Sequence, residues 1–148
     1  MKKILIVNGP NLNMLGVREP DKYGNLKLED ILLKCKEISS KFGYEVISFQ
    51  SNLEGEIVSF IQKEGLKASG MILNAGAYTH TSIAIRDAIL AVNIPFVEVH
   101  ISNVFKRESF RHHSYLSDIA IGVISGFKAD SYYAGLMCLL SYLGENVF

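Results

Sequence analysis

Glu98 and His100 are the two residues of this sequence best placed to form an acid–base pair. They stand two apart in the apolar segment 95–101, and alternate residues of a β-strand point to one face of its sheet. A carboxylate beside an imidazole fixes the ring's tautomer and raises its basicity, so a protonated His100 could donate to a leaving group. The alternative is a histidine that only completes its hydrogen bonds at a strand end.

A second candidate pair lies in the long connection over residues 10–26. Arg18 and Tyr23 are five apart in it. A tyrosine has an ordinary pKa of ~10, which is too high for a base at neutral pH, but a nearby guanidinium favours tyrosinate and could lower that pKa. An exposed tyrosine beside a solvated arginine is the alternative. A connection this long inside a compact domain often serves as a lid over a site.

Arg107 and Arg111 have the i, i+4 spacing of one helical face, where two guanidinium groups could clamp a carboxylate. A solvated surface pair is the alternative. His112 and His113 follow, but adjacent side chains point apart and would not chelate one ion. Without an HExxH motif or a cysteine cluster, we predict no metal site.

The elements that must position these residues are short strands alternating with helices. Apolar runs predict strands at residues 4–7, 44–50, 71–73, 95–101 and 119–124, and apolar residues at helical spacing predict helices over 28–38, 54–61, 85–92 and 132–143. Ser51 and Glu54 have capping-box spacing and are expected to open the second helix. This alternation implies right-handed βαβ crossovers. We predict one flavodoxin-like α/β domain over residues 1–148, a doubly wound five-stranded parallel sheet of order 2-1-3-4-5 with helices on both faces.

In such sheets ligands bind at the carboxyl ends of the strands. Polar residues follow three predicted strands there, at 8–13, 74–82 and 100–103. Their convergence favours a functional site around His100. Neither GxGxxG nor GxxxxGK[ST] occurs, which argues against a dinucleotide site or a P-loop.

Composition narrows the class of protein. The chain has 148 residues, 49% of them hydrophobic, which suits one globular domain and excludes disorder, collagen and coiled coil. Fifteen basic and fifteen acidic residues give zero net charge, so we expect no binding to nucleic acid or to an anionic membrane. Cys35 and Cys138 form no CxxC motif, and Cys35 is expected in the core. The apolar run after Lys3 is too short for a signal peptide, so we expect a cytoplasmic location.

Taken together, these segments resemble type II 3-dehydroquinate dehydratases, the small-subunit dehydroquinases of the shikimate and quinate pathways. The matching pieces occur in order along nearly the whole chain, and the ordered set is specific where any one piece is weak. They are NGPNLN at 8–13, LG at 15–16, REP at 18–20, YG at 23–24, QSN at 50–52, NAG at 74–76, THTS at 79–82, RDA at 86–88, EVHISN at 98–103, FR at 110–111 and HSYLS at 113–117.

The resemblance implies an anti elimination of water from 3-dehydroquinate to give 3-dehydroshikimate through an enolate, without metal or organic cofactor. It implies Tyr23 as the base, Arg18 as the group that holds it as tyrosinate, and His100, oriented by Glu98, as the acid. Asn11 would position a water beside the enolate oxygen. The implied substrate-binding residues are Asn74, His80, Ile101, Ser102, Arg111 and, less directly, Arg107.

The resemblance further implies a homo-oligomer, a dodecamer of four trimers, in which Asp87 reaches the site of a neighbouring subunit. The chain departs from the family pattern at Lys128 and Ser131, where glycines are usual, and at His112, where arginine is common. None of these positions is an implied catalytic residue. They bear on loop conformation and assembly.

Two other functions stay open on the residues alone. A flavodoxin-like module that binds FMN would need a Ser/Thr-rich phosphate loop after the first strand, where Pro10 offers no N–H. A dehydratase acting on another small hydroxy-keto acid would use the same residues. The Schiff-base dehydroquinases need a (β/α)₈ barrel of ~250 residues, longer than this chain.

Overall fold

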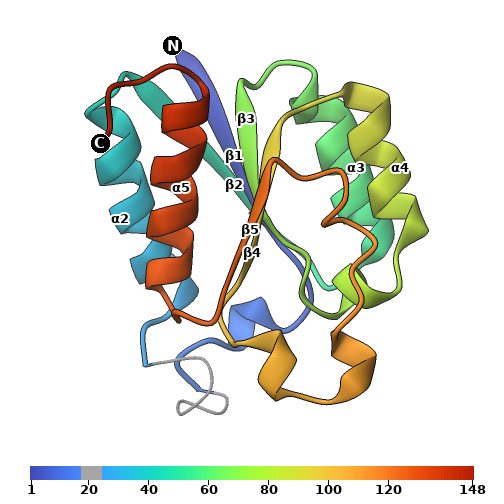
Figure 1. Cartoon of the computed structure of the whole chain (residues 1–148). Coiled ribbons are helices and arrows are strands. Elements are labelled where there is room, and N and C mark those ends of the chain that lie inside the picture. Colours follow the sequence, from blue (N-terminus) through green and yellow to red (C-terminus); the bar gives the residue numbers. More distant parts are fainter. Residues whose placement is uncertain (18–24) are drawn as a thin grey trace.

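The computed structural model describes residues 1–17 and 25–148 and contains one five-stranded sheet (Figure 1). All of its strands are parallel, in the order β2-β1-β3-β4-β5, as predicted. The strands are β1 Lys2–Asn8, β2 Tyr44–Gln50, β3 Gly70–Asn74, β4 Phe96–His100 and β5 Gly122–Ser125, and the α-helices are α2 Leu28–Ser40, α3 Glu54–Gly65, α4 Ile83–Val92 and α5 Asp130–Tyr142.

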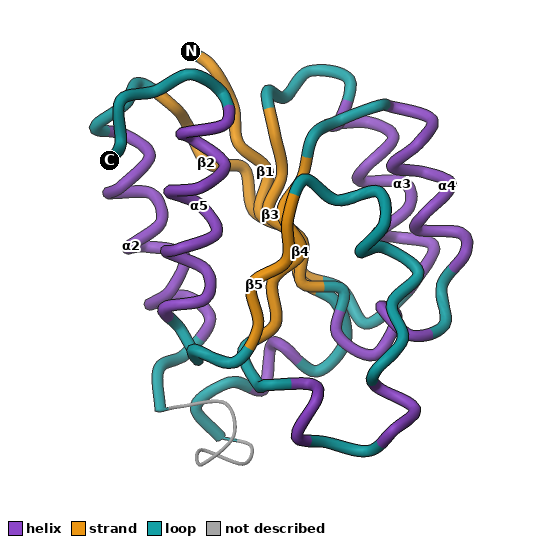
Figure 2. The backbone as a smooth tube through the Cα atoms, in the orientation of Figure 1, coloured by secondary structure: helices purple, strands orange, loops and turns teal. Residues whose placement is uncertain are grey.

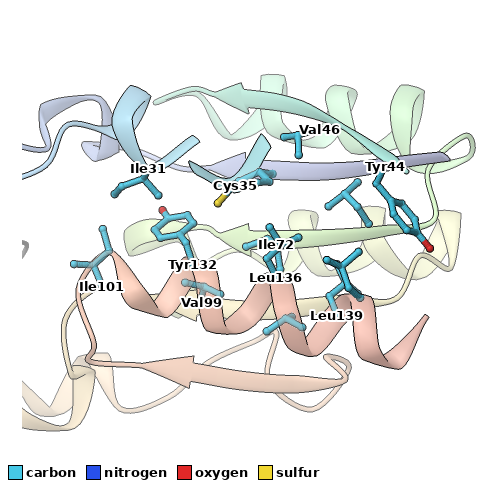
Figure 3. Packing of buried hydrophobic residues seen from close by; sticks show 14 of the residues in the cluster. Ile31, Cys35, Tyr44, Val46, Ile72, Val99, Ile101, Tyr132, Leu136 and Leu139 are labelled. Atoms are coloured by element: carbon cyan, nitrogen blue, oxygen red, sulfur yellow. The ribbon is translucent and has the colours of Figure 1, made fainter. Parts of the chain in front are cut away.

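The helices cover the sheet in two layers. Helices α2 and α5 lie on one face, and α3 and α4 on the other (Figure 1). Alternate residues of β1 supply the two cores: Ile4 and Ile6 pack toward α2 and α5, while Leu5 and Val7 pack toward α3 and α4. Figure 3 shows the first of these cores. A strand buried on both faces explains the unbroken apolar run in the sequence.

Among the described residues, four short 3₁₀ helices lie in the connections that leave the carboxyl ends of three strands. They are η1 Leu12–Met14, η2 Gly76–His80, η3 Val104–Lys106 and η4 Ser109–Arg111. Figure 2 shows these segments and their loops gathered at one end of the sheet. This is the edge at which we expected a site.

Two local predictions are wrong. The last strand begins at Gly122 rather than near 119, because the N–H groups of Ile119 and Ala120 donate to the Leu116 carbonyl and form a turn. Ser51 does not form a capping box with Glu54. Leu53 is the N-cap of α3, and the Ser51 hydroxyl accepts from the Leu53 N–H.

No helix within residues 1–17 and 25–148 is long and apolar enough to span a membrane.

Candidate active site

The turn after β1 approaches the turn after β3 so closely that the sequence must place glycine there. The Gly9 N–H donates to the Asn74 carbonyl at 2.8 Å, and a Cβ on Gly9 would overlap the backbone of Ala75. The next turn puts Asn11 in the left-handed region, with φ 70°. Its N–H donates to Asn52 Oδ1 at 3.0 Å. Both asparagine-bearing loops, at residues 11 and 74, are thereby held at one sheet edge.

Asn74 is fixed by a buried hydrogen-bond chain. Its Nδ2 donates to the Tyr132 hydroxyl at 3.0 Å, and that hydroxyl donates to Asn8 Oδ1 at 2.5 Å. The Asn74 Oδ1 accepts from the Gly76 N–H at 3.1 Å. A side-chain amide has two donor hydrogens and two acceptor sites on its oxygen. Within residues 1–17 and 25–148, Asn74 therefore keeps one N–H and one lone pair for a ligand.

Glu98 and His100 form the predicted pair. His100 Nε2 lies 2.5 Å from Glu98 Oε2, and both side chains are buried. Burial alone would raise the pKa of Glu98, but the hydrogen bond and charge of His100 and two serine hydroxyls lower it below its usual value. Glu98 is thus an ionised partner on Nε2. Nδ1 is then the nitrogen through which His100 can donate to a ligand.

His80 is anchored through its other nitrogen. Its Nδ1 lies 2.8 Å from the His113 carbonyl oxygen, which only accepts, so Nδ1 carries the hydrogen. Burial lowers the pKa of His80, and the charges of His100 and Arg111 lower it further. The hydrogen bond to the His113 carbonyl and the charge of Glu98 raise this pKa, but the net effect is a lower value. The neutral ring that results presents Nε2 as an acceptor for a hydroxyl.

Arg107 and Arg111 do not share a helical face. Arg107 follows η3 with extended backbone (φ −105°, ψ −168°), whereas Arg111 closes η4. The prediction of one helix was wrong, but both side chains line the same cavity. Arg107 Nη1 donates to Ser102 Oγ at 3.3 Å, and Arg111 Nε donates to Glu108 Oε2 at 2.6 Å. Glu108 therefore orients Arg111 through Nε and, as far as the described residues go, leaves its two terminal nitrogens for an anion.

A cavity of about 120 Å³ at the carboxyl ends of β1, β3 and β4 brings most of the predicted residues together. Those that line it are Asn11, Asn74, His80, His100, Ile101, Ser102, Arg107 and Arg111. A larger cavity of about 550 Å³ adjoins it and shares His80, His100, Val104 and Arg111 with it. Glu98 lines only this second cavity, which places the pair between the two spaces.

Two described residues of the predicted site do not line this cavity: Glu98, which lines the adjoining one, and Asp87. Asp87 is exposed on α4. Arg18 and Tyr23 lie outside the described residues. Ser114, Ser117 and Tyr132 contact site residues but were not predicted. The spacing of Ser114 and Ser117 gives no sign that they meet Glu98, which lies sixteen and nineteen residues earlier.

The described parts of the chain contain no group of three histidine, cysteine or acidic side chains arranged to hold a metal ion. His112 and His113 point to different partners. The His112 Nε2 lies 3.2 Å from the Arg107 carbonyl oxygen, whereas the His113 ring packs edge-on against Tyr115.

Comparison with known proteins identifies the family. Residues 2–140 match the family Dehydroquinase class II. The chain is 52% identical over 143 residues to a 3-dehydroquinate dehydratase of Sodalis glossinidius (strain morsitans), covering 97% of this chain and 95% of that protein. It is 53% identical over 141 residues to the 3-dehydroquinate dehydratase of Histophilus somni (strain 2336), covering 95% and 94%.

Solved structures agree in fold. The type II dehydroquinase of Butyrivibrio crossotus DSM 2876 superposes with a TM-score of 0.89 at 44% identity, over 93% of this chain and 97% of that one. The enzyme of Propionibacterium acnes gives 0.88 at 34% identity, over 98% of each chain. This chain therefore belongs to the class II dehydroquinase family.

Proposed function

We propose that this chain is a 3-dehydroquinate dehydratase, which removes water from 3-dehydroquinate to give 3-dehydroshikimate in the shikimate pathway. The observation that carries the proposal is the buried Glu98–His100 pair, 2.5 Å apart, beside a cavity that also holds Arg111 and His80. An ionised carboxylate on one ring nitrogen and a free nitrogen opposite suit a proton donor to a leaving hydroxyl.

The reaction that we propose is an anti elimination through an enolate. Tyr23, held as tyrosinate by Arg18, takes a proton from the carbon next to the ketone, and the electron pair moves onto the ketone oxygen. Asn11 positions a water that stabilises this oxygen. The enolate then expels the hydroxyl, which leaves as water after His100 Nδ1 donates its proton. These roles use no metal and no organic cofactor.

The polar residues of the cavity are proposed to bind the substrate. Arg111, oriented by Glu108, binds the carboxylate through its two terminal nitrogens. The neutral His80 accepts from a hydroxyl through Nε2, and Asn74 uses its remaining N–H and lone pair. Ile101 and Ser102, which follow β4, line the cavity and are proposed to contact the substrate. Arg107 contributes positive charge next to Ser102.

The assembly and location of the enzyme are part of the proposal. We propose a single catalytic domain over residues 1–148 that forms a homododecamer, in which the exposed Asp87 of α4 reaches the site of a neighbouring subunit. A cytoplasmic location fits the free thiol of buried Cys35. Sedimentation of a stable monomer would contradict the assembly.

The test is a rise in ultraviolet absorbance from the conjugated enone product when purified protein meets 3-dehydroquinate. We expect a rise that survives chelator and borohydride, is lost in Tyr23→Phe, and persists in Tyr142→Phe, which alters an exposed tyrosine on α5. Folded, oligomeric protein that gives no rise would overturn the proposed substrate. Near-normal turnover by Tyr23→Phe would remove Tyr23 as the base.

A further inference from the structure

The two carboxylate oxygens of Glu98 have different partners. Oε2 faces His100 Nε2 at 2.5 Å. Oε1 accepts from the hydroxyls of Ser114 at 3.0 Å and Ser117 at 2.7 Å. Both serines lie in the connection between η4 and β5, far from Glu98 in sequence. Glu98 is only 2% exposed, so these hydroxyls stand where water would otherwise solvate the carboxylate.

We infer that Ser114 and Ser117 are positioning residues for the acid step, acting on His100 through Glu98. They hold the carboxylate in one orientation and keep it ionised while His100 gives up and regains its proton. This inference deepens the proposed function, because it rests on the proposed role of His100 as the general acid.

The hydrogen bonds of Ser114 leave its hydroxyl proton only one direction. Its oxygen accepts from the N–H groups of Leu116 at 3.0 Å and Ser117 at 3.1 Å. A hydroxyl has two acceptor sites and one hydrogen. With both acceptor sites filled by backbone donors, the hydrogen must go to Glu98. The Ser114 hydroxyl therefore always donates its hydrogen to Glu98, whereas a water molecule in the same place could turn and present its oxygen instead.

The turn that carries both serines is anchored on both sides. The Tyr115 N–H donates to the Thr79 carbonyl at 3.0 Å, and Arg86 Nη1 donates to the Tyr115 carbonyl at 2.9 Å. Leu116 is fully buried in the core beneath α3 and α4. The hydroxyls thus have little freedom to follow a displaced Glu98, which is the property that positioning requires.

All three donors around Glu98 favour its charged form, since a carboxylate accepts and a protonated acid must also donate. The neighbouring strands present Leu73 and Val123 beside Glu98. Among the described residues, the other titratable or charged side chains that face the same cavity are His80, Arg86, Arg111, His112, His113, Tyr115 and Asp118. Burial raises the pKa of Glu98, and the hydrogen-bond donors oppose this effect. Loss of one serine hydroxyl removes one donor, so the pKa of Glu98 should rise.

The decisive variant is Ser117→Ala, because Ser117 Oγ has Glu98 as its hydrogen-bond partner and accepts no backbone N–H within the described residues. We expect kcat at neutral pH to fall about tenfold with a smaller change in KM, because His100 acts in the chemical step. Ser117→Thr keeps a hydroxyl and should restore kcat. Ser59→Ala on α3, at an exposed serine, is the matched control and should leave kcat and KM unchanged.

An unchanged kcat in Ser117→Ala would overturn the inference, as would a loss of kcat that Ser117→Thr does not restore. A second measurement needs no turnover: a ¹³C titration of the Glu98 carboxyl should show a higher pKa in Ser117→Ala than in the parent chain, and an equal pKa would also overturn it. If the parent chain fails to convert 3-dehydroquinate, the proposed function fails while this titration still decides the Glu98 contact.

Discussion

The rings of His80 and His100 lie nearly parallel, with centroids 6.4 Å apart and planes 16° apart, yet they are anchored through opposite nitrogens. His80 uses Nδ1 on the His113 carbonyl, and His100 uses Nε2 on Glu98. Burial lowers the pKa of His80 and favours its neutral ring, whereas the carboxylate on His100 fixes which ring nitrogen is left to face a ligand. Two adjacent histidines are thereby suited to different tasks, one accepting a hydrogen bond and one donating a proton.

The first prediction concerns the protonation of His80. Its folded-state pKa lies below the ordinary 6.5, so the unfolded chain takes up a proton first as pH falls. The stability that neutral His80 contributes is therefore present above pH 6.5 and lost as pH falls through the folded-state pKa. Long-range ¹H–¹⁵N NMR should show the Nδ1–H tautomer and a midpoint below 6.5. A midpoint above 6.5, or an Nε2–H tautomer, would contradict this assignment.

The second prediction tests the buried chain that holds Asn74. Tyr132→Phe removes the hydroxyl between Asn74 Nδ2 and Asn8 Oδ1 and leaves both buried groups without that partner. We expect the free energy of unfolding to fall by about 1–3 kcal/mol, and KM to rise because Asn74 is no longer oriented. Tyr133→Phe, one residue along α5 and only partly buried, is the control for denaturant unfolding and kinetics. Equal effects of the two variants would rule out a role for the chain.

The third prediction concerns the anion-binding group. Arg111→Ala should raise KM about 10- to 150-fold with a smaller change in kcat, the loss expected when hydrogen bonds between two charged groups are removed. Glu108→Gln should raise KM less, because it weakens only the contact to Arg111 Nε. Lys106→Ala, at an exposed neighbour, controls for charge. A collapse of kcat at unchanged KM would assign Arg111 to the transition state instead.

Much of this fold could be predicted because apolar patterns report directly on burial. The strand expected at 44–50 is Tyr44–Gln50, and the helical spacing from residue 28 marks α2. The Glu98–His100 contact could also be predicted, since two residues two apart on one strand share a face. Eight residues expected on family resemblance do line the cavity. The rule that alternate residues share a face holds for Glu98 and His100 because β4 is a regular strand through both of them.

The contacts that could not be predicted join distant segments without any periodic signal. Ser114 and Ser117 reach Glu98 only because the chain between η4 and β5 turns back against η2. Arg107 and Arg111 have helical spacing, but two separate 3₁₀ turns carry them. Tyr132 reads as one apolar residue of α5, and only the fold shows that its hydroxyl meets Asn74.

The fourth prediction addresses a departure from the family pattern. Lys128 has φ 53°, in the left-handed region that favours glycine, and its N–H donates to the Ile101 carbonyl. Lys128→Gly keeps that hydrogen bond and relieves the backbone strain at this position. Glycine also makes the unfolded chain more flexible, which offsets part of the gain, so we expect the free energy of unfolding to rise by about 0.5–1 kcal/mol. Lys41→Gly, at φ −64°, should instead lower stability. Thermal unfolding of both variants measures the difference, and a destabilised Lys128→Gly would contradict the strain argument.

The fifth prediction tests the close approach of the two site loops. In Gly9→Ala the new Cβ would overlap the carbonyl of Ala75, so the turn after β1 must move away from the turn after β3. That movement strains the Gly9 N–H bond to the Asn74 carbonyl and displaces Asn11 from the cavity edge. We expect the free energy of unfolding to fall by about 1–3 kcal/mol. We also expect kcat/KM to fall by a larger factor than the fraction of folded protein does.

The control is Gly55→Ala in α3, where a Cβ meets nothing within 4 Å. Alanine favours helix, so this variant should gain up to about 1 kcal/mol and keep its activity. Denaturant unfolding and initial rates should be measured on the same preparations of both variants. If Gly9→Ala matched Gly55→Ala in both stability and initial rate, the contact between residues 9 and 75 would not set the geometry of the site. If Gly9→Ala lost only stability, the contact would support the fold without placing Asn11.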